Sequence, residues 1–584
     1  MYSLLSLKKY LLIYKKRFLL GVFFIFLSNY FAIYPAQFIR KGIDLLYQHL
    51  QNTTLNSDLI INQIINLSLM IIIFSIIKGF FLFLTRQTII VNSRKIEFDI
   101  KNDIFKNYLK SKIHFYKKNK VGDIMSRITE DVSQIRIFLG PGLMYPLNLF
   151  FLFIIIIITM IKINLKLTII SMLPLPVMGV LIFVISKIIN EKSINKQKQL
   201  AEISSISQET FAGIRNIKSY KCSNFFIKKF LNGINTYKDK NLALANTNAM
   251  FFPVIVTLIG FGTIMTVMIG GQEVMKQNIS PGNIAEFIIY INMLTWPMAS
   301  IGWITSLTQQ AAASQKRINE FLNEEKENIN LNYTIKKQIN NFDIEFQNVD
   351  FKYPDSEKYA LQNISTKINK NNIIGITGKT GSGKSTLLNL IPKLYEINKG
   401  KIIINGIEAS NIDLNLLRRS IGFVPQDPIL FAESIKENIS FREPNIKDNE
   451  IYEYAKINDI HKEIMRFNKK YNSKVGERGL TLSGGQKQRI SIARSMINKS
   501  PLMIFDDAFS ALDSKTEKKI INKIIKNKSK QTTIISSNKI STLKYCDKII
   551  ILKNGKIDNE GSLQYLIKNS KTFKKLFKNQ LINN

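Results

Sequence analysis

Six long apolar stretches in the first half of the chain restrict its fold more than any other feature. Each is close to the ~20 residues that a helix needs to cross ~30 Å of hydrocarbon. Because a segment in lipid must satisfy its own backbone hydrogen bonds, they predict six transmembrane helices. Only Lys162, Asn164 and Lys166 divide the third stretch from the fourth. The stretches cover residues 18–39, 60–84, 142–161, 166–187, 250–271 and 284–307.

Basic residues predict how these helices are oriented. Clusters of Lys and Arg precede the first stretch and follow the second, which places both ends in the cytosol. We therefore expect a multi-pass protein of the cell inner (plasma) membrane with a cytoplasmic N-terminus. Residues 1–17 mix leucine with a basic face and predict an interfacial elbow helix, retained rather than removed as a signal peptide. A plain cytosolic extension of the first span is the alternative.

The net charge points to an anionic partner. The chain has 81 Lys+Arg against 43 Asp+Glu, a formal charge of +38. Six membrane spans favour the lipid bilayer over nucleic acid, and no nucleic acid partner is expected. A base-composition bias of the gene is the competing explanation, because Lys, Ile and Asn are abundant even in loops. Only two cysteines occur, Cys222 and Cys546, so neither a disulfide framework nor a metal cluster is predicted.

The second half of the chain has a different pattern. A transmembrane domain over residues 18–320 is followed by a polar stretch without periodicity, so we place an interdomain linker at 321–341. Short β-type runs then alternate with helical stretches, which predicts an α/β domain over residues 342–580.

A phosphate-binding loop opens this second domain. GKTGSGKS fits the pattern GxxxxGK[ST], follows the strand-like run 373–376 and leads into a helical run. Glycines let backbone N–H groups turn toward phosphate oxygens, and the helix directs its positive dipole end to the same place. Lys384 is expected to reach the β- and γ-phosphates of ATP, and the Ser385 hydroxyl to ligate Mg²⁺. The expected nucleotide contacts in the loop are Gly378, Lys379, Thr380, Gly381, Ser382, Gly383, Lys384, Ser385 and Thr386.

A second acidic motif lies downstream. The apolar run 502–505 predicts a buried parallel strand, and Asp506 at its end would lie beside the phosphate loop. Asp506 is therefore the second candidate ligand of Mg²⁺.

Between these motifs, LSGGQ at 482–486 resembles the signature of ABC transporters. Further elements similar to that family are Tyr353 in FKYP, Gln426 in VPQDP, VGERG at 475–479 and SALD at 510–513. The resemblance implies that Tyr353 stacks on adenine and that Gln426 senses Mg²⁺ and contacts the membrane domain. It also implies a dimer, because the signature binds the γ-phosphate held by the opposite subunit. The signature residues concerned are Ser483, Gly484, Gly485 and Gln486.

The membrane half carries the same resemblance. KVGDIMSRITEDV at 120–132 resembles the first cytosolic loop of ABC exporters, GIRNIKSY at 213–220 the second, and residues 280–297 their last span. The implied fold is a multi-domain membrane protein, with a six-helix all-α transmembrane domain followed by an α/β P-loop ABC ATPase domain. Because the ATPase follows the membrane domain in one chain, the order resembles an exporter-type half-transporter of the multidrug class.

Two positions depart from the family's pattern. ABC ATPases usually have Glu after the strand-ending Asp, as the base that orients attacking water, and this chain has Asp507. Its carboxylate is one methylene shorter, roughly 1.5 Å of reach. Asn538 occupies the position of the family's switch His and cannot carry an imidazolium charge. We therefore take Asp507, Asn538 and Gln426 as catalytic candidates of a weakened site.

These features predict ATP-driven export of a small amphipathic, drug-like or lipid-like cargo by a dimer with a sister ABC half-transporter. A heterodimer is favoured because this chain's signature is intact and can complete a site on the sister chain. The alternatives are a non-transporting ATP-binding membrane regulator, a homodimeric lipid flippase, and drift at Asn538 in a homodimer. Lys78 and Glu286 are the main ionisable residues within the spans.

Overall fold

The computed structural model describes residues 2–51, 57–327, 339–441, 443, 446–476, 479 and 481–582. The chain divides into two compact units. The helical unit comprises residues 1–110 and 119–324, and the α/β unit comprises residues 111–118 and 325–584. Most of the predicted linker, residues 328–338, lies outside the described residues.

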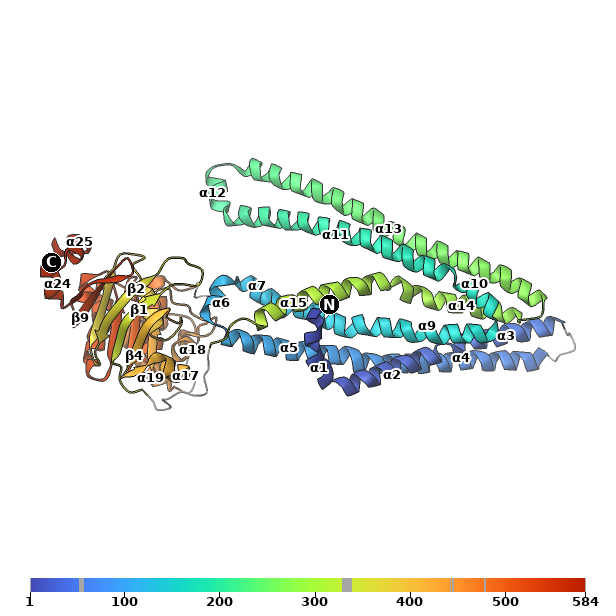
Figure 1. Ribbon diagram of the computed structural model, residues 1–584, viewed down its shortest axis with the longest axis horizontal. Coiled ribbons are helices and arrows are strands. Elements are labelled where there is room, and N and C mark those ends of the chain that lie inside the picture. Colours follow the sequence, from blue (N-terminus) through green and yellow to red (C-terminus); the bar gives the residue numbers. More distant parts are fainter. Residues whose placement is uncertain are drawn as a thin grey trace. The chain divides into compact units, whose positions relative to one another are not determined.

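Six long helical stretches build the helical unit, which confirms the predicted six-helix fold (Figure 1). They run over Lys15–Gln51, Asp58–Lys110, Val121–Ile163, Leu165–Ala212, Ser223–Met275 and Pro281–Leu322, and each contains one of the apolar stretches. Most are made of several elements, which are α2 (Lys15–Phe31), α3 (Tyr34–Gln51), α4 (Ser57–Thr85), α5 (Val91–Lys110), α7 (Val121–Ser126), α8 (Val132–Ile137), α9 (Leu143–Ile163), α10 (Leu165–Met172), α11 (Pro174–Ala212), α13 (Ser223–Met275), α14 (Pro281–Ala299) and α15 (Ile301–Leu322).

Shorter elements complete this unit. Three single turns of π-helix interrupt the second and third stretches: η2 (Arg86–Ile90), η3 (Arg127–Asp131) and η4 (Phe138–Gly142). The N-terminus forms η1 (Tyr2–Leu7) and α1 (Lys8–Ile13), and α12 (Ile214–Ser219) joins α11 to α13.

The turn between the third and fourth stretches is defined by Asn164. Its side-chain oxygen caps α10 by accepting a hydrogen bond from the Leu167 backbone amide at 2.9 Å. Its side-chain amide nitrogen donates to the Glu273 carboxylate at 3.3 Å. A capped helix start explains why three polar residues are enough to separate two spans.

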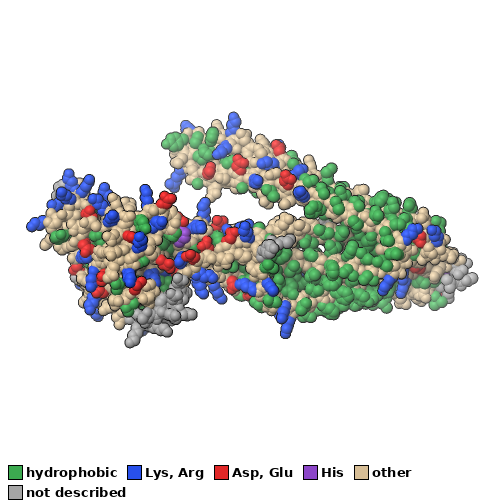
Figure 2. All heavy atoms as spheres, viewed as in Figure 1, with side chains coloured by type: hydrophobic (Ala, Val, Ile, Leu, Met, Phe, Trp, Pro, Cys, Tyr) green, Lys and Arg blue, Asp and Glu red, His purple; other side chains and the backbone are tan. Residues whose placement is uncertain are grey.

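Apolar side chains cover much of the face of the helical unit that Figure 2 shows. On α4 the exposed ones include Ile65, Leu69, Ile72, Ile76 and Phe80. Such a surface is stable only against hydrocarbon or another apolar protein surface. The chain is therefore a multi-pass membrane protein.

Two sheets form the α/β unit. An antiparallel sheet has the order β2-β1-β4-β5, from β1 (Ile344–Phe351), β2 (Leu361–Ile368), β4 (Lys399–Ile404) and β5 (Ile407–Glu408). A six-stranded sheet has the order β10-β9-β3-β8-β7-β6. Its strands are β3 (Ile373–Gly378), β6 (Ile421–Val424), β7 (Leu502–Asp506), β8 (Thr532–Ser536), β9 (Lys548–Lys553) and β10 (Lys556–Gly561). All neighbours in this sheet pair in parallel except β9 and β10.

Central strands β3, β7 and β8 are buried along their whole length, as expected for parallel strands covered on both faces. A separate apolar cluster, which extends from α18 (Ile435–Ser440) to α21 (Gly484–Met496), forms a small helical subdomain. The helices of this unit are α6 (Ile113–Lys118), α16 (Lys384–Leu390), η5 (Ala409–Asn411), α17 (Leu414–Arg419), α18 (Ile435–Ser440), α19 (Asp448–Ile457), α20 (His461–Ile464), η6 (Lys470–Asn472), α21 (Gly484–Met496), α22 (Ser514–Lys526), η8 (Lys528–Lys530), α23 (Ile540–Leu543), α24 (Leu563–Asn569), α25 (Lys571–Leu576) and α26 (Lys578–Ile582).

Candidate nucleotide site and signature helix

The candidate site residues gather at one edge of the six-stranded sheet. The phosphate loop follows β3, Asp506 ends β7 and Asn538 comes shortly after β8. Because β3, β8 and β7 are parallel neighbours, their carboxyl ends meet at the same edge. Gln426 follows β6, the next strand, and is exposed.

Two glycines give the loop its path. Gly378 has φ of 154°, and a Cβ there would lie 2.2 Å from the Leu552 carbonyl oxygen. Gly383 has φ of 102°, and a Cβ there would lie 2.9 Å from the Ala360 carbonyl oxygen. Side chains are excluded at both positions, which lets the backbone of the loop approach phosphate oxygens closely.

Lys384 lies over the loop rather than in solvent. Its Nζ donates to the carbonyl oxygens of Gly378 at 2.7 Å and Lys379 at 3.2 Å. Burial lowers the pKa of Lys384, and the nearby carboxylates of Asp507 and Asp506 oppose that shift. The ammonium group is thus held where a phosphate chain would replace the carbonyl oxygens as its partner.

The residues present fit a nucleotide with its metal ion. The Thr377 and Ser382 hydroxyls are buried and have no hydrogen bond partner among the described residues. Asp506 accepts a hydrogen bond from Ser385, and burial raises the pKa of its carboxyl. In the described part of the chain no three His, Cys, Asp or Glu side chains gather to hold a metal. A hydroxyl and one carboxylate suit Mg²⁺, which takes its other ligands from phosphate and water.

The backbone of Asp507 is held firmly. Its φ is 48°, its N–H donates to the Ser536 carbonyl oxygen at 3.2 Å, and its own carbonyl oxygen accepts from the Ser510 hydroxyl at 2.8 Å. Burial first, and then the Asp506 carboxylate, raise the pKa of Asp507. The two hydrogen bonds hold the backbone of Asp507 next to the end of β7.

Asn538 lies beside the phosphate loop. Together with Thr377, Gly378, Lys379 and Thr380 it lines a cavity of about 440 Å³, which Leu576 and Phe577 close from the C-terminal helices. The next residue, Lys539, donates to the Phe509 carbonyl oxygen at 3.1 Å and to Glu517 at 3.2 Å. Its positive charge is therefore already engaged by a carboxylate.

The aromatic residue proposed to stack on adenine is half-buried near the loop. The Tyr353 hydroxyl lies 3.0 Å from the Thr386 hydroxyl, and its ring meets Phe351 edge-on at 4.9 Å. Sequence reasoning missed Lys117 of α6, whose Nζ lies 4.8 Å from the centre of the Tyr353 ring. The basic and aromatic run HFYKK at 114–118 was the available signal.

The signature begins helix α21. Ser483 caps this helix, and the side-chain oxygen of Gln486 accepts a hydrogen bond from the Ser483 amide at 2.9 Å. Ser483 and Gly484 are exposed, and a Cβ on Gly485 would lie 3.1 Å from the Ala511 carbonyl oxygen. Of VGERG at 475–479, Glu477 and Arg478 lie outside the described residues.

Within the described part of the chain, the residues lining the cavity beside the phosphate loop include none from the signature. The cap of α21 is instead exposed.

Comparison with known proteins agrees with this arrangement. Residues 18–298 match the ABC transporter transmembrane region, and residues 361–510 match the ABC transporter family. A multidrug resistance-like ATP-binding protein MdlA from Buchnera aphidicola is 32% identical over 98% of this chain and 97% of its own length. A probable multidrug resistance ABC transporter ATP-binding/permease protein, YheI of Bacillus subtilis, is 32% identical over 80% of each chain.

A solved bacterial Atm1-family ABC exporter with ATP bound has the same fold. Its TM-score is 0.81 at 21% identity, over 97% of this chain and 98% of that one. This chain combines a six-helix membrane unit with a nucleotide-binding α/β unit and matches exporter-type relatives over nearly its full length. It belongs to the ABC transporter family, as an ATP-hydrolysing half-transporter of the multidrug exporter type.

Proposed function

We propose that this chain exports a small amphipathic cargo as one half of a heterodimeric transporter, and that its own ATP site hydrolyses slowly. The observation that carries the proposal is the pairing of Asp507 and Asn538 beside an otherwise complete phosphate loop. The signature, by contrast, keeps every residue of LSGGQ. This chain would hold ATP while its signature completes a faster site on a sister half-transporter.

ATP binding in this chain would use the loop as described. Backbone N–H groups and Lys384 would hold the phosphates, and Tyr353 would stack on adenine. Ser385 and Asp506 would hold Mg²⁺, with Gln426 beside it, and the metal would neutralise charge on the phosphates. The Ser483 hydroxyl and the backbone N–H groups of Gly484 and Gly485 would contact the γ-phosphate bound by the sister chain.

Slow hydrolysis follows from two deficits. The Asp507 carboxylate falls roughly 1.5 Å short of the position that a Glu would reach. Asn538 can donate a hydrogen bond to the γ-phosphate but brings no positive charge to the transition state. Because Lys539 is paired with Glu517, it does not supply that charge instead.

The basic residues around the helical unit support an orientation in the inner membrane with the N-terminus and the α/β unit in the cytoplasm. The net charge of +38 suits an anionic cytoplasmic leaflet.

The test is the ATPase activity of the purified chain, alone and co-expressed with a sister half-transporter, each with and without Asp507→Glu plus Asn538→His. We expect activity only with the sister, and little change on repair because the sister's site dominates. Brisk turnover by the chain alone would instead establish a working homodimer. Absence of activity and transport in both preparations would favour an ATP-binding regulator.

A further inference from the structure

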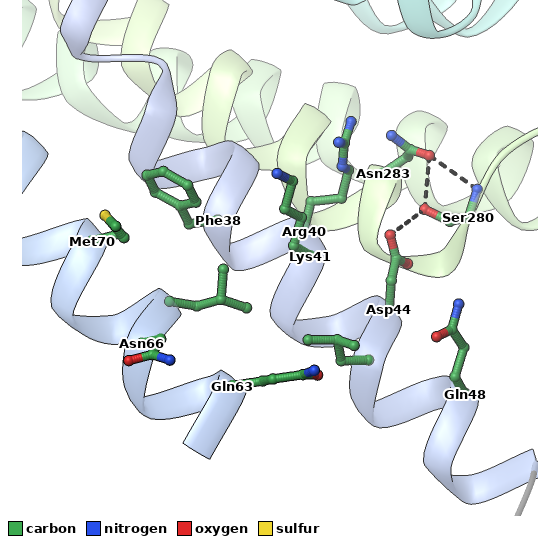
Figure 3. A pocket seen from close by; sticks show the side chains of 12 residues that line it. Phe38, Arg40, Lys41, Asp44, Gln48, Gln63, Asn66, Met70, Ser280 and Asn283 are labelled. Carbon is green, nitrogen blue, oxygen red and sulfur yellow. Dashed lines mark hydrogen bonds between the residues drawn. The ribbon is translucent and has the colours of Figure 1, made fainter. Parts of the chain in front are cut away.

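A pocket in the helical unit is lined by none of the candidate nucleotide-site residues. It has a volume of about 750 Å³ and lies between α3 and α4, where the first residues of α14 meet them (Figure 3). This is the size of many small-molecule sites. In a six-span chain, the α3–α4 and α13–α14 connections lie on the same side, opposite the N-terminus. The pocket is lined by Phe38, Arg40, Lys41, Asp44, Leu45, Gln48, Gln63, Asn66, Leu67, Met70, Ser280 and Asn283.

The pocket is apolar at one end and polar at the other. Phe38 of α3 and Met70 of α4 lie at one end, and Gln48 lies at the opposite end (Figure 3). Ten residues of helix separate Phe38 from Gln48, about 15 Å at ~1.5 Å per residue. Because Phe38 and Met70 fall within the apolar stretches and Gln48 lies beyond them, the polar end faces the membrane surface.

One wall of the pocket is rigid. Asp44 accepts hydrogen bonds from the Ser280 hydroxyl at 2.7 Å and from the Gly282 amide at 2.8 Å (Figure 3). Arg40 donates to the fully buried Glu286 at 3.2 Å. A Cβ on Gly282 would lie 2.3 Å from the Arg40 carbonyl oxygen, so α14 packs directly on the backbone of α3.

These contacts leave the positive charge of Lys41 without a carboxylate partner among the described residues. The charge of Arg40 is balanced by Glu286, and that of Asp44 by the amide and hydroxyl donors at the positive end of α14. Lys41 is exposed, and its Nζ lies 5.9 Å from the centre of the Phe38 ring. Among the described residues no carboxylate pairs with it. Gln48, Gln63 and Asn66 likewise make no side-chain hydrogen bond within the described part of the chain.

We propose that this pocket binds an amphiphile with an anionic head group. The head group would contact Lys41, and its chain would lie against Phe38, Leu67 and Met70. Water is a poor occupant of the apolar end at this depth, whereas hydrocarbon is abundant there. The ligand chemistry fits either an anionic membrane lipid or a free anionic amphiphile, and the inference does not depend on which nucleotide site hydrolyses ATP.

Fluorescence quenching in vesicles tests the proposal. The assembled transporter would carry the reporter Met70→Trp. Trp296→Phe and Trp303→Phe would remove this chain's own tryptophans, and the sister chain's tryptophans would be replaced as well. Asn66→Trp serves as a second reporter in case the first alters the pocket. Vesicles of phosphatidylcholine would contain dibrominated phosphatidylglycerol or, for comparison, dibrominated phosphatidylcholine. Free dodecyl sulfate below its micellar concentration would then compete with the brominated lipid.

We expect the anionic lipid to quench the reporter more strongly than the zwitterionic lipid. Lys41→Gln should weaken that preference about fivefold, the effect of one basic residue on an anionic lipid near the surface. Lys41→Arg should keep it. Lys162→Gln is the matched control, because Lys162 is exposed at the end of α9 on the same side and does not line the pocket.

Two results support the proposal and separate the sources of ligand. Preferential quenching by the anionic lipid that depends on Lys41 assigns a membrane lipid. Equal quenching by both lipids, with relief by dodecyl sulfate that Lys41→Gln abolishes, assigns a free amphiphile. The proposal is overturned if, with both reporters, the two lipids quench equally and neither dodecyl sulfate nor Lys41→Gln changes the quenching.

Discussion

At the scale of single residues, we expect nucleotide binding by this chain to depend most on Lys384. Its ammonium group is held over the phosphate loop by two carbonyl oxygens, whereas the Lys379 side chain is exposed. Lys384→Ala should weaken ATP binding at this site by about tenfold or more, because a charge-assisted hydrogen bond contributes about 1.5–3 kcal/mol. Photolabelling with 8-azido-ATP measures the effect, and Lys370→Ala, at an exposed position outside the phosphate loop, is the control. Equal losses in the two variants would contradict this role.

The acidic pair makes stability depend on pH. The pKa of Asp507 is raised in the folded protein by burial and by Asp506. Its stabilising contribution is therefore complete below the ordinary Asp value of about 4 and is lost as the pH rises through the higher folded value. Asp507→Asn should make the thermal stability of the nucleotide-free protein fall less between pH of about 4 and neutrality.

A second aspartate provides the control for that series. Hydrogen bonds from the Thr516 amide and side chain lower the pKa of Asp513. Its contribution is present above the ordinary Asp value and is lost as the pH falls, so Asp513→Asn should alter the profile in the opposite sense. Tm values measured across the range test both variants, and parallel profiles for wild type and Asp507→Asn would refute the assignment.

At the scale of elements, sequence patterns predicted the helices, strands and loops that neighbouring residues in the chain determine. The strand, loop and helix around the phosphate loop are confirmed as β3, residues 379–383 and α16, and the strand before Asp506 is confirmed as β7. The apolar windows located six helices but not their ends. Apolar residues are needed only where a helix lies within the bilayer, whereas its backbone hydrogen bonds continue into the polar residues outside the bilayer. Helix α13, for example, runs for 53 residues around a window of about 20.

Contacts between distant segments could not be predicted. Lys117 reaches the Tyr353 ring across more than two hundred residues, and nothing in the local sequence of either specifies the other. The pocket beside Lys41 was missed for the same reason, because it needs α3, α4 and α14 together. The single turns of π-helix have no sequence pattern that we can identify.

The junction of α3 with α14 yields a prediction at this scale. Glu286 is fully buried and accepts hydrogen bonds from Arg40 at 3.2 Å and from the Tyr290 hydroxyl at 2.7 Å. Glu286→Ala leaves Arg40 without its partner and should destabilise the helical unit by about 1–3 kcal/mol, less than a fully buried pair because Arg40 is partly exposed. Tyr290→Phe removes one hydrogen bond and should cost about 1 kcal/mol.

Thermal unfolding of the detergent-purified protein compares the two variants. The Tm should fall further for Glu286→Ala than for Tyr290→Phe. A Glu286→Ala protein as stable as the wild type would show that the pair does not hold α3 against α14.

At the scale of the whole molecule, the distribution of site residues supports the proposed pairing with a second chain. The cavity beside the phosphate loop is closed by Leu576 and Phe577 but, in the described part of the chain, receives nothing from the signature. The cap of α21 is exposed. In the proposed heterodimer the two nucleotide sites would differ in activity. Asp507 and Asn538 would act on the nucleotide bound by this chain, and LSGGQ on the nucleotide bound by the sister chain.

The most direct measurement is steady-state ATPase activity of the assembled heterodimer with two substitutions, each made separately in this chain. Gly485→Asp places a negative charge beside the γ-phosphate bound by the sister chain and should reduce activity by about a hundredfold, the effect of losing a preorganised donor. Asp507→Asn removes the base of the slow site and should leave most of the activity. If Asp507→Asn abolished turnover while Gly485→Asp left it intact, this chain's own site would be the active one, contradicting the heterodimer proposed here.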